Sequence, residues 1–144
     1  MKVPSKSQWG AVNTEDLDAE WAYNNFAGVT LDAAEKMFQE NALYYQEALI
    51  SMPPIAFNCY APVFAKYIAS DHAASDADGA SSFLHMIIEL LEANRSLTSP
   101  ETLQCLLEAA KIVSEKQSYY DADTDIYGEF SELYAKISSL LDGS

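Results

Sequence analysis

Apolar side chains recur every three to four residues through most of this chain, and that spacing constrains the fold more than any other feature. Between residues 80 and 91 the pattern is almost uninterrupted, and Glu89 and Glu92 fall on the opposite side. Such a stripe is typical of a helix that buries one face in a core. The members of the stripe are Ala80, Phe83, Leu84, Ile87, Ile88 and Leu91.

Further stripes follow residues 30, 100 and 125, and no segment alternates in the way a strand does. We therefore predict an all-α fold, a single-domain bundle of five or six helices over residues 1–144. Stacked antiparallel helix pairs are an alternative arrangement of the same helices. With 144 residues the chain is long enough to bury a core of its own.

Caps and prolines predict where these helices begin and end. Thr30 and Ser99 are favourable N-caps, and Pro100 suits the first position of the helix after Ser99. Pro62 is expected to kink or split the helix that follows Pro53 and Pro54. Small polar residues make 70–79 the clearest loop, and we expect residues 1–12 to form a loosely ordered N-terminal arm.

Net charge is the feature that says most about partners. The chain has 22 Asp and Glu against 8 Lys and Arg, for a formal charge of -14. Such an imbalance favours a basic protein partner, and it disfavours nucleic acid and anionic membrane surfaces as ligands. No secretory signal or membrane-spanning run is visible, so we expect a cytoplasmic protein.

The acid is concentrated in residues 119–132, which hold five carboxylates, four aromatic rings and no cation. Tyrosine offers a large contact area with a polar tip, and surrounding carboxylates would steer a cationic partner toward it. We predict that this segment is the partner-binding surface. Its candidate contact residues are Tyr119, Tyr120, Asp121, Asp123, Asp125 and Glu129.

The same segment allows an alternative in which it binds a metal. Asp121, Asp123, Asp125 and Glu132 stand at positions 1, 3, 5 and 12 of a calcium-binding EF-hand loop. Position 6 of that loop requires glycine for a sharp turn and is Ile126 here. A metal-responsive or regulatory helical module built on Asp121–Glu132 is therefore the second hypothesis, and an acidic first turn of the last helix explains the carboxylates without a metal.

Catalytic motifs are missing from the sequence. The two histidines, His72 and His85, have no cysteine, serine or carboxylate at a recognisable spacing. The chain also lacks a glycine-rich phosphate loop and paired Cys-x-x-Cys motifs. We expect a protein that is not an enzyme and needs no cofactor, with Cys59 and Cys105 as inert core thiols.

Local residue patterns also resemble those of a known class of proteins. Four short runs look like those of small acidic bacterial proteins. They are Phe26-Ala27-Gly28-Val29-Thr30, Ala34-Glu35-x-x-Phe38, Met52-Pro53-Pro54 and Tyr119-Tyr120-Asp121. In overall character the chain resembles the immunity proteins that protect bacteria from toxins. Among these, helical colicin-type inhibitors, which are shorter, use an acidic helix and a Tyr-Tyr pair against a basic nuclease. The resemblance implies a toxin domain as partner, contacted through Tyr119, Tyr120, Asp121 and Asp123.

Overall fold

The computed structural model describes residues 2–143, and within this range the chain is helical without a β-strand. Six of its α-helices have ten or more residues, which confirms the predicted all-α fold and number of helices. A seventh, α6, is a single turn. The helices are α1 (Leu17–Phe26), α2 (Leu31–Gln46), α3 (Pro54–Ile68), α4 (Ala77–Ala93), α5 (Pro100–Glu115), α6 (Thr124–Tyr127) and α7 (Phe130–Asp142).

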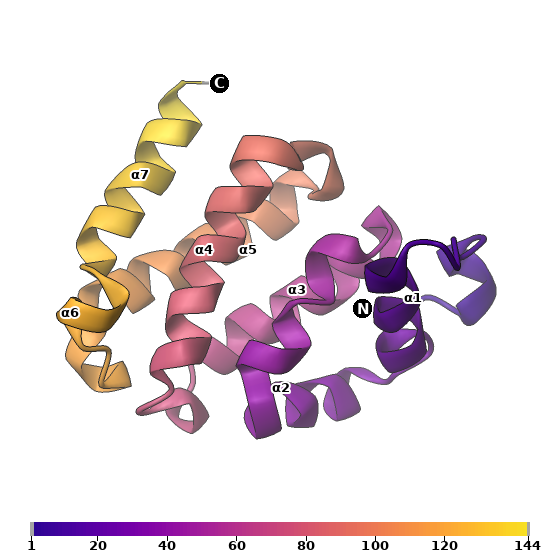
Figure 1. Ribbon diagram of the computed structural model, residues 1–144, viewed down its shortest axis with the longest axis horizontal. Helices are drawn as coiled ribbons and strands as arrows, with labels where there is room; N and C mark the ends of the chain where they lie inside the picture. Colours follow the sequence, from indigo (N-terminus) through magenta and orange to yellow (C-terminus); the bar gives the residue numbers. More distant parts are fainter. Residues whose placement is uncertain (1, 144) are drawn as a thin grey trace.

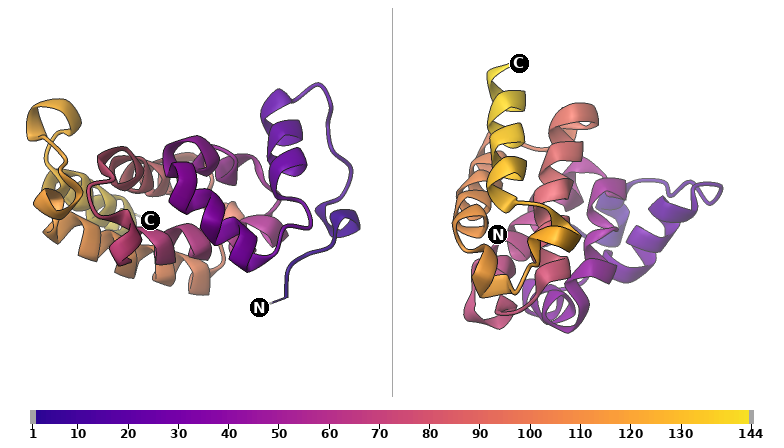
Figure 2. Two further views of the ribbon diagram at one scale, coloured as in Figure 1. Left: turned by 90° about the horizontal axis from the view of Figure 1, so that it is seen from below. Right: turned by 60° about the vertical axis from the view of Figure 1, so that its left-hand side comes forward.

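The longer helices pack in two layers. Helix α4 contacts α2 on one side and α7 on the other, and α3 contacts α5 beneath them. Helices α2 and α3 pack together across the layers, as do α5 and α7 (Figure 1). This arrangement places α1 at one end of the long axis and α6 at the other (Figure 2). The N-terminal and C-terminal parts of the chain therefore form opposite ends of the molecule.

Aromatic rings join the helices through the centre of the core. Phe38 of α2 stacks on Phe64 of α3 with ring centroids 5.0 Å apart, and Phe64 meets Phe83 of α4 edge to face at 5.1 Å. All three side chains have no exposed surface. Burial of a ring of this size stabilises the fold by about 1.5 to 3 kcal/mol. Cys59 is buried and Cys105 partly so, and burial raises the pKa of both thiols.

The predicted caps are present, whereas the helix is not split at Pro62 and α2 has an interruption that was not predicted. Thr30 and Ser99 accept hydrogen bonds from Ala33 and Thr102 as N-caps of α2 and α5. Helix α3 continues through Pro62 without a break. Instead α2 is interrupted at Asn41, whose backbone is extended (φ -162°, ψ 80°) and whose side chain accepts from the Tyr44 amide. Asparagine is a favourable N-cap, so it restarts the helix there.

The segment predicted as an N-terminal arm contains one turn that packs on the core. A 3-10 turn spans Lys6–Trp9, and Trp9 is only 7 % exposed. Its ring meets Tyr23 of α1 edge to face, with centroids 5.7 Å apart. Trp9 therefore packs this segment of the chain against α1. Met1, the first residue of that arm, lies outside the described residues.

Candidate acidic junction

The chain between α5 and α7 is organised by one glutamine. Gln117 begins the 3-10 turn Gln117–Tyr120, and its side-chain amide donates to the carbonyl oxygens of Ala122 (3.0 Å) and Gly128 (2.8 Å). Its Oε1 accepts from the Phe130 amide at 2.9 Å, the first amide of α7. Gln117 thus satisfies an otherwise unpaired helix-end amide, a role usually filled by an N-cap side chain. The predicted last helix is consequently divided, with α6 ended by Gly128 at φ 72°.

A second acidic segment, Asp71–Asp78, is joined to this one by hydrogen bonds. The Ser75 amide donates to the Tyr119 carbonyl at 3.0 Å, and the Ser75 hydroxyl donates to Asp121 Oδ2 at 2.6 Å. Ser75 and Asp121 both have left-handed backbones, with φ of 66° and 54°. Non-glycine residues adopt this conformation rarely. The two segments are therefore joined by hydrogen bonds of two residues with strained backbones. We name residues 71–78 and 117–129 together the acidic junction.

Tyrosine hydroxyls fix two further carboxylates of the acidic junction. Tyr67 of α3 donates to Asp76 at 2.6 Å, and Tyr127 of α6 donates to Asp78 at 2.6 Å. Asp76 is also the N-cap of α4, where its carboxylate accepts a hydrogen bond from the Gly79 amide. The Asp76 carboxylate lies so close to Gly79 that a Cβ at residue 79 would not fit. Burial raises the pKa of Tyr67, with a smaller contribution from Asp76, and the hydrogen bond to Asp78 raises that of Tyr127.

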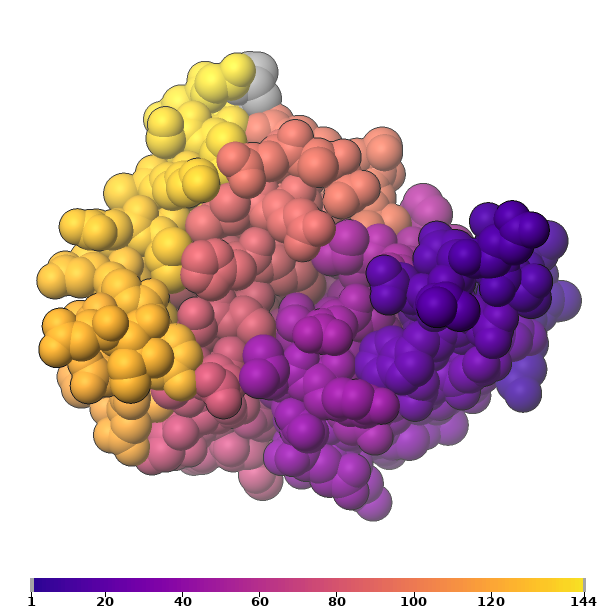
Figure 3. Space-filling model, in the orientation of Figure 1, coloured from indigo at the N-terminus to yellow at the C-terminus, as the bar shows by residue number. Residues whose placement is uncertain are grey.

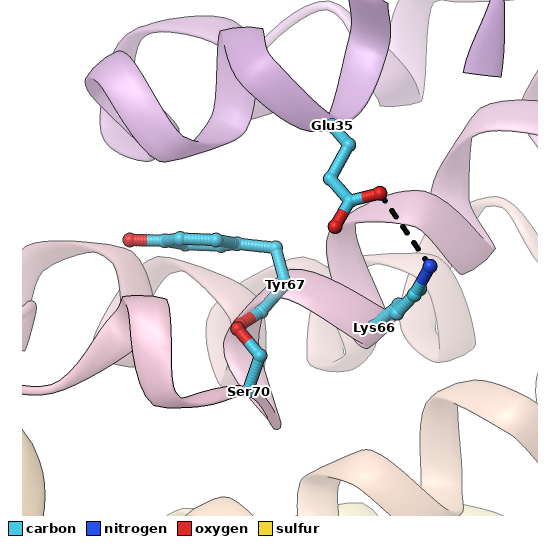
Figure 4. Close-up of polar contacts among 4 residues, drawn as sticks. All are labelled: Glu35, Lys66, Tyr67 and Ser70. Atoms are coloured by element: carbon cyan, nitrogen blue, oxygen red, sulfur yellow. Dashed lines mark hydrogen bonds and ion pairs between the residues drawn. The ribbon is translucent and has the colours of Figure 1, made fainter. Parts of the chain in front are cut away.

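Lysines near the acidic junction are engaged elsewhere or lie at its edge. Lys66 pairs with Glu35 of α2 at 3.4 Å, on a different side of α3 from the Tyr67 ring (Figure 4). Lys116 lies over the Tyr119 ring, 5.7 Å from its centroid. Residues 67–94 and 117–135 contain no Lys or Arg. The carboxylates of the acidic junction are therefore largely uncompensated.

The structure brings together five of the six predicted contact residues at the surface. Tyr119 is 38 % exposed, and four carboxylates next to it are exposed as well. These four are Asp121, Asp123, Asp125 and Glu129. Figure 3 shows their segment at one end of the molecule, beside the start of α4.

Tyr120 lies in the core and not among the exposed contact residues that the sequence predicted. Its side chain is 1 % exposed, and its hydroxyl donates to the Ile68 carbonyl at 2.7 Å. Burial raises the pKa of Tyr120 to about 12. Because the ring fills the core between α3 and the turn Gln117–Tyr120, it offers no contact surface to a partner. In a Tyr-Tyr pair the sequence does not say which ring faces inward.

Sequence reasoning missed Ile126 and Gln117 as contributors to this surface, and it did not place the loop Asp71–Asp78 beside them. Ile126 is 73 % exposed in the middle of the acidic residues, where it offers an apolar contact. Gln117 gains its role through contacts up to thirteen residues along the chain, and the loop Asp71–Asp78 through contacts with the distant Tyr119 and Asp121. The signal available in the sequence was the apolar Ile126 within an otherwise acidic run.

Metal binding finds no preformed site in the described part of the chain. Residues 2–143 contain no group of three or more His, Cys, Asp or Glu side chains placed to hold an ion. Asp121 accepts from Ser75, and Asp123 accepts from the Asp125 amide at 2.8 Å as N-cap of α6. Two of the four carboxylates of the EF-hand-like spacing are thus engaged in hydrogen bonds of the fold.

Comparisons with known proteins give no relative for this chain. No family model matches it, and searches of curated proteins and of solved structures find no significant match. None of the helices within residues 2–143 combines the length and the apolar character that crossing a membrane requires. The functional argument therefore depends on the residues of the site.

Proposed function

We propose that the protein binds and neutralises a basic protein partner, in the manner of a bacterial immunity protein acting on a nuclease-type toxin. One observation supports this most: two acid-rich segments distant in sequence are joined into one surface without Lys or Arg of its own. Tyr119 and Ile126 are exposed on that surface and provide contact area. Aromatic and apolar anchors within a charged rim are the usual composition of an interface.

Inhibition of this kind requires no catalysis by the inhibitor. A nuclease attracts its anionic substrate with a basic surface, and an acidic protein competes for that surface or covers a neighbouring one. Charge complementarity accelerates encounter, and the exposed side chains of Tyr119 and Ile126 then prolong the complex. The hydrogen bonds of Ser75 and Gln117 make the surface a rigid frame. A rigid frame loses less conformational entropy on binding. Such an inhibitor acts in the cytosol of the cell that makes the toxin.

A titration of toxin activity tests this proposal. The proteins encoded next to this one are purified, and the nuclease activity of any basic protein among them is measured against increasing amounts of inhibitor. We expect stoichiometric loss of activity with the wild-type protein, and a weaker effect with Asp125→Lys and Ile126→Ala. Glu89→Lys is the matched control, because Glu89 is exposed on α4 about three turns beyond Asp78. Equal inhibition by all variants, or none by the wild type, would contradict the proposal.

The metal-responsive alternative has no observation of its own in its favour. Calcium titration calorimetry distinguishes it, and we expect weak binding at most because Ile126 replaces the turn glycine. A sub-micromolar affinity that Asp121→Ala abolishes would replace the proposed function with a cation-binding one.

A further inference from the structure

The end of the molecule formed by α1, opposite α6, carries a separate groove of rings and carboxylates. Trp21 of α1 and Tyr44 of α2 meet edge to face, with ring centroids 5.0 Å apart and planes at 89°. Leu17, Asp18 and Glu47 complete the lining of an open cavity of about 310 Å³. We name these five residues the aromatic groove. The structure thus joins two acid-and-aromatic segments, around residues 15–23 and 44–47, that are far apart in sequence.

The rings of the aromatic groove are available to a ligand. Tyr44 is 48 % exposed and Leu17 at the rim is 76 % exposed. Tyr44 is oriented by the break in α2, since Asn41 accepts from its amide at 3.1 Å, and by Tyr45, whose ring centroid lies 5.0 Å away. A continuous helix through Asn41 would direct residue 44 elsewhere. Exposed rings held in place on a helical frame are typical of a recognition site.

Charge determines which ligand fits. Residues 7–35 and 37–65 contain no Lys or Arg, so the carboxylates of Asp18 and Glu47 have no cation from their own segments. Aromatic faces attract organic cations, and carboxylates hydrogen-bond them at the same time. A bare metal ion would require a set of oxygen ligands, whereas this cavity has rings and an aliphatic rim.

We propose that the aromatic groove binds the guanidinium group of an arginine side chain on a partner protein. Guanidinium is planar, stacks on aromatic rings and donates to carboxylates from a fixed fork, and it is less strongly hydrated than an ammonium group. The groove offers both kinds of surface within one cavity. This inference goes beyond the proposed function, because the site shares no residue with the acidic junction and needs no toxin.

Fluorescence of Trp21 measures this binding directly. The chain has 2 tryptophans, so Trp9→Phe leaves Trp21 as the reporter. This background should fold, because the indole nitrogen of Trp9 is buried without a hydrogen-bond partner in the described structure and its loss leaves no new unpaired group. The probe is a blocked Gly-Arg-Gly peptide. We expect a saturable change in Trp21 emission, and none with the same peptide carrying citrulline, which has the shape of arginine without its charge.

Variants distinguish binding of the peptide in the aromatic groove from nonspecific attraction of a cation to an acidic protein. Tyr44→Leu and Glu47→Gln should each weaken the arginine peptide about threefold or more. Glu47 is exposed, so its variant keeps the fold even where Tyr44→Leu loses stability. Glu89→Gln, at an exposed position of α4 outside both sites, should leave the Trp21 response unchanged.

Three results would overturn the inference. An equal response to the citrulline peptide would show that charge is not recognised. Equal affinity for a lysine peptide would remove the assignment to guanidinium. Unchanged affinity in Glu47→Gln would place the arginine outside the aromatic groove. None of these results bears on toxin inhibition, so failure here and failure of the proposed function are distinguishable.

Discussion

The two ends of the molecule use the same kinds of residues in different ways. At both ends a Tyr-Tyr pair has its rings edge to face, with centroids 5.0 Å apart for Tyr44 and Tyr45 and 5.1 Å apart for Tyr119 and Tyr120. In the first pair Tyr44 is 48 % exposed and Tyr45 is partly buried. In the second pair Tyr120 is 1 % exposed and bonded to α3. Identical dipeptides in acidic surroundings therefore contribute differently to the core.

The difference lies in how each end is held. The acidic junction depends on hydrogen bonds between distant segments, from Gln117, Ser75 and the tyrosine hydroxyls. The aromatic groove depends on ring contacts and on a local cap at Asn41. Substitutions should consequently cost more stability at the acidic junction than at the groove.

Tyrosine truncation at the two ends should give the largest contrast. Tyr120→Ala leaves a cavity in the core and an unpaired Ile68 carbonyl, so we expect a loss of about 3 to 5 kcal/mol in the free energy of unfolding. Tyr44→Ala removes a half-exposed ring and should cost about 0.5 to 1.5 kcal/mol. Urea unfolding at neutral pH measures both. Equal losses would show that the difference in burial between Tyr120 and Tyr44 has no energetic consequence.

Glutamine substitution tests the same contrast through hydrogen bonds. Gln117→Ala removes three bonds that join the turn to α6 and α7, and we expect a loss of about 1 to 3 kcal/mol. Gln46 makes one long bond to the Leu43 carbonyl, at 3.4 Å, and Gln46→Ala should stay within about 0.5 kcal/mol. Thermal unfolding followed by circular dichroism compares them. A Gln117→Ala protein as stable as Gln46→Ala would mean that the acidic junction is not held by this side chain.

High pH should weaken both ends through one buried tyrosine at each. Burial raises the pKa of Tyr60, which donates to the carbonyls of Phe26 and Val29, and of Tyr120 to about 12 from 10.0. Above pH 10 the unfolded state loses these protons while the folded state keeps them, so stability falls between about pH 10 and 12. Tyr60→Phe and Tyr120→Phe should each flatten this decline, as measured by urea midpoints at several pH values. An unchanged slope in both variants would contradict the assignment.

Sequence patterns predicted the helices well because each depends on residues close in the chain. The stripe after residue 80 and the caps Thr30 and Ser99 are local signals, and the structure confirms them. Asn41 was missed because its apolar neighbours continue a helical pattern across the break. The division between α6 and α7 was missed because Gln117, thirteen residues before Phe130, supplies the cap.

The candidate sites show the same limit. Acidic and aromatic residues occur together at 15–23, 40–47 and 119–132, and residues 70–79 form a polar loop, but nothing local reveals which of these segments meet. Long-range bonds such as Ser75 to Asp121 join the loop to one segment, and the Trp21 and Tyr44 rings join the other two. The inward position of Tyr120 likewise depends on α3, more than fifty residues earlier in the chain.

Association kinetics test the central claim most directly, that the acidic junction captures a basic partner. Stopped-flow association rates with a basic protein that the wild type inhibits would be measured for the wild type, Asp125→Lys and Glu89→Lys at low and high salt. We expect Asp125→Lys to associate roughly threefold or more slowly at low salt and to lose much of the salt dependence, with Glu89→Lys near the wild type. Rates for Asp125→Lys that equal those of Glu89→Lys at both salt concentrations would contradict the account.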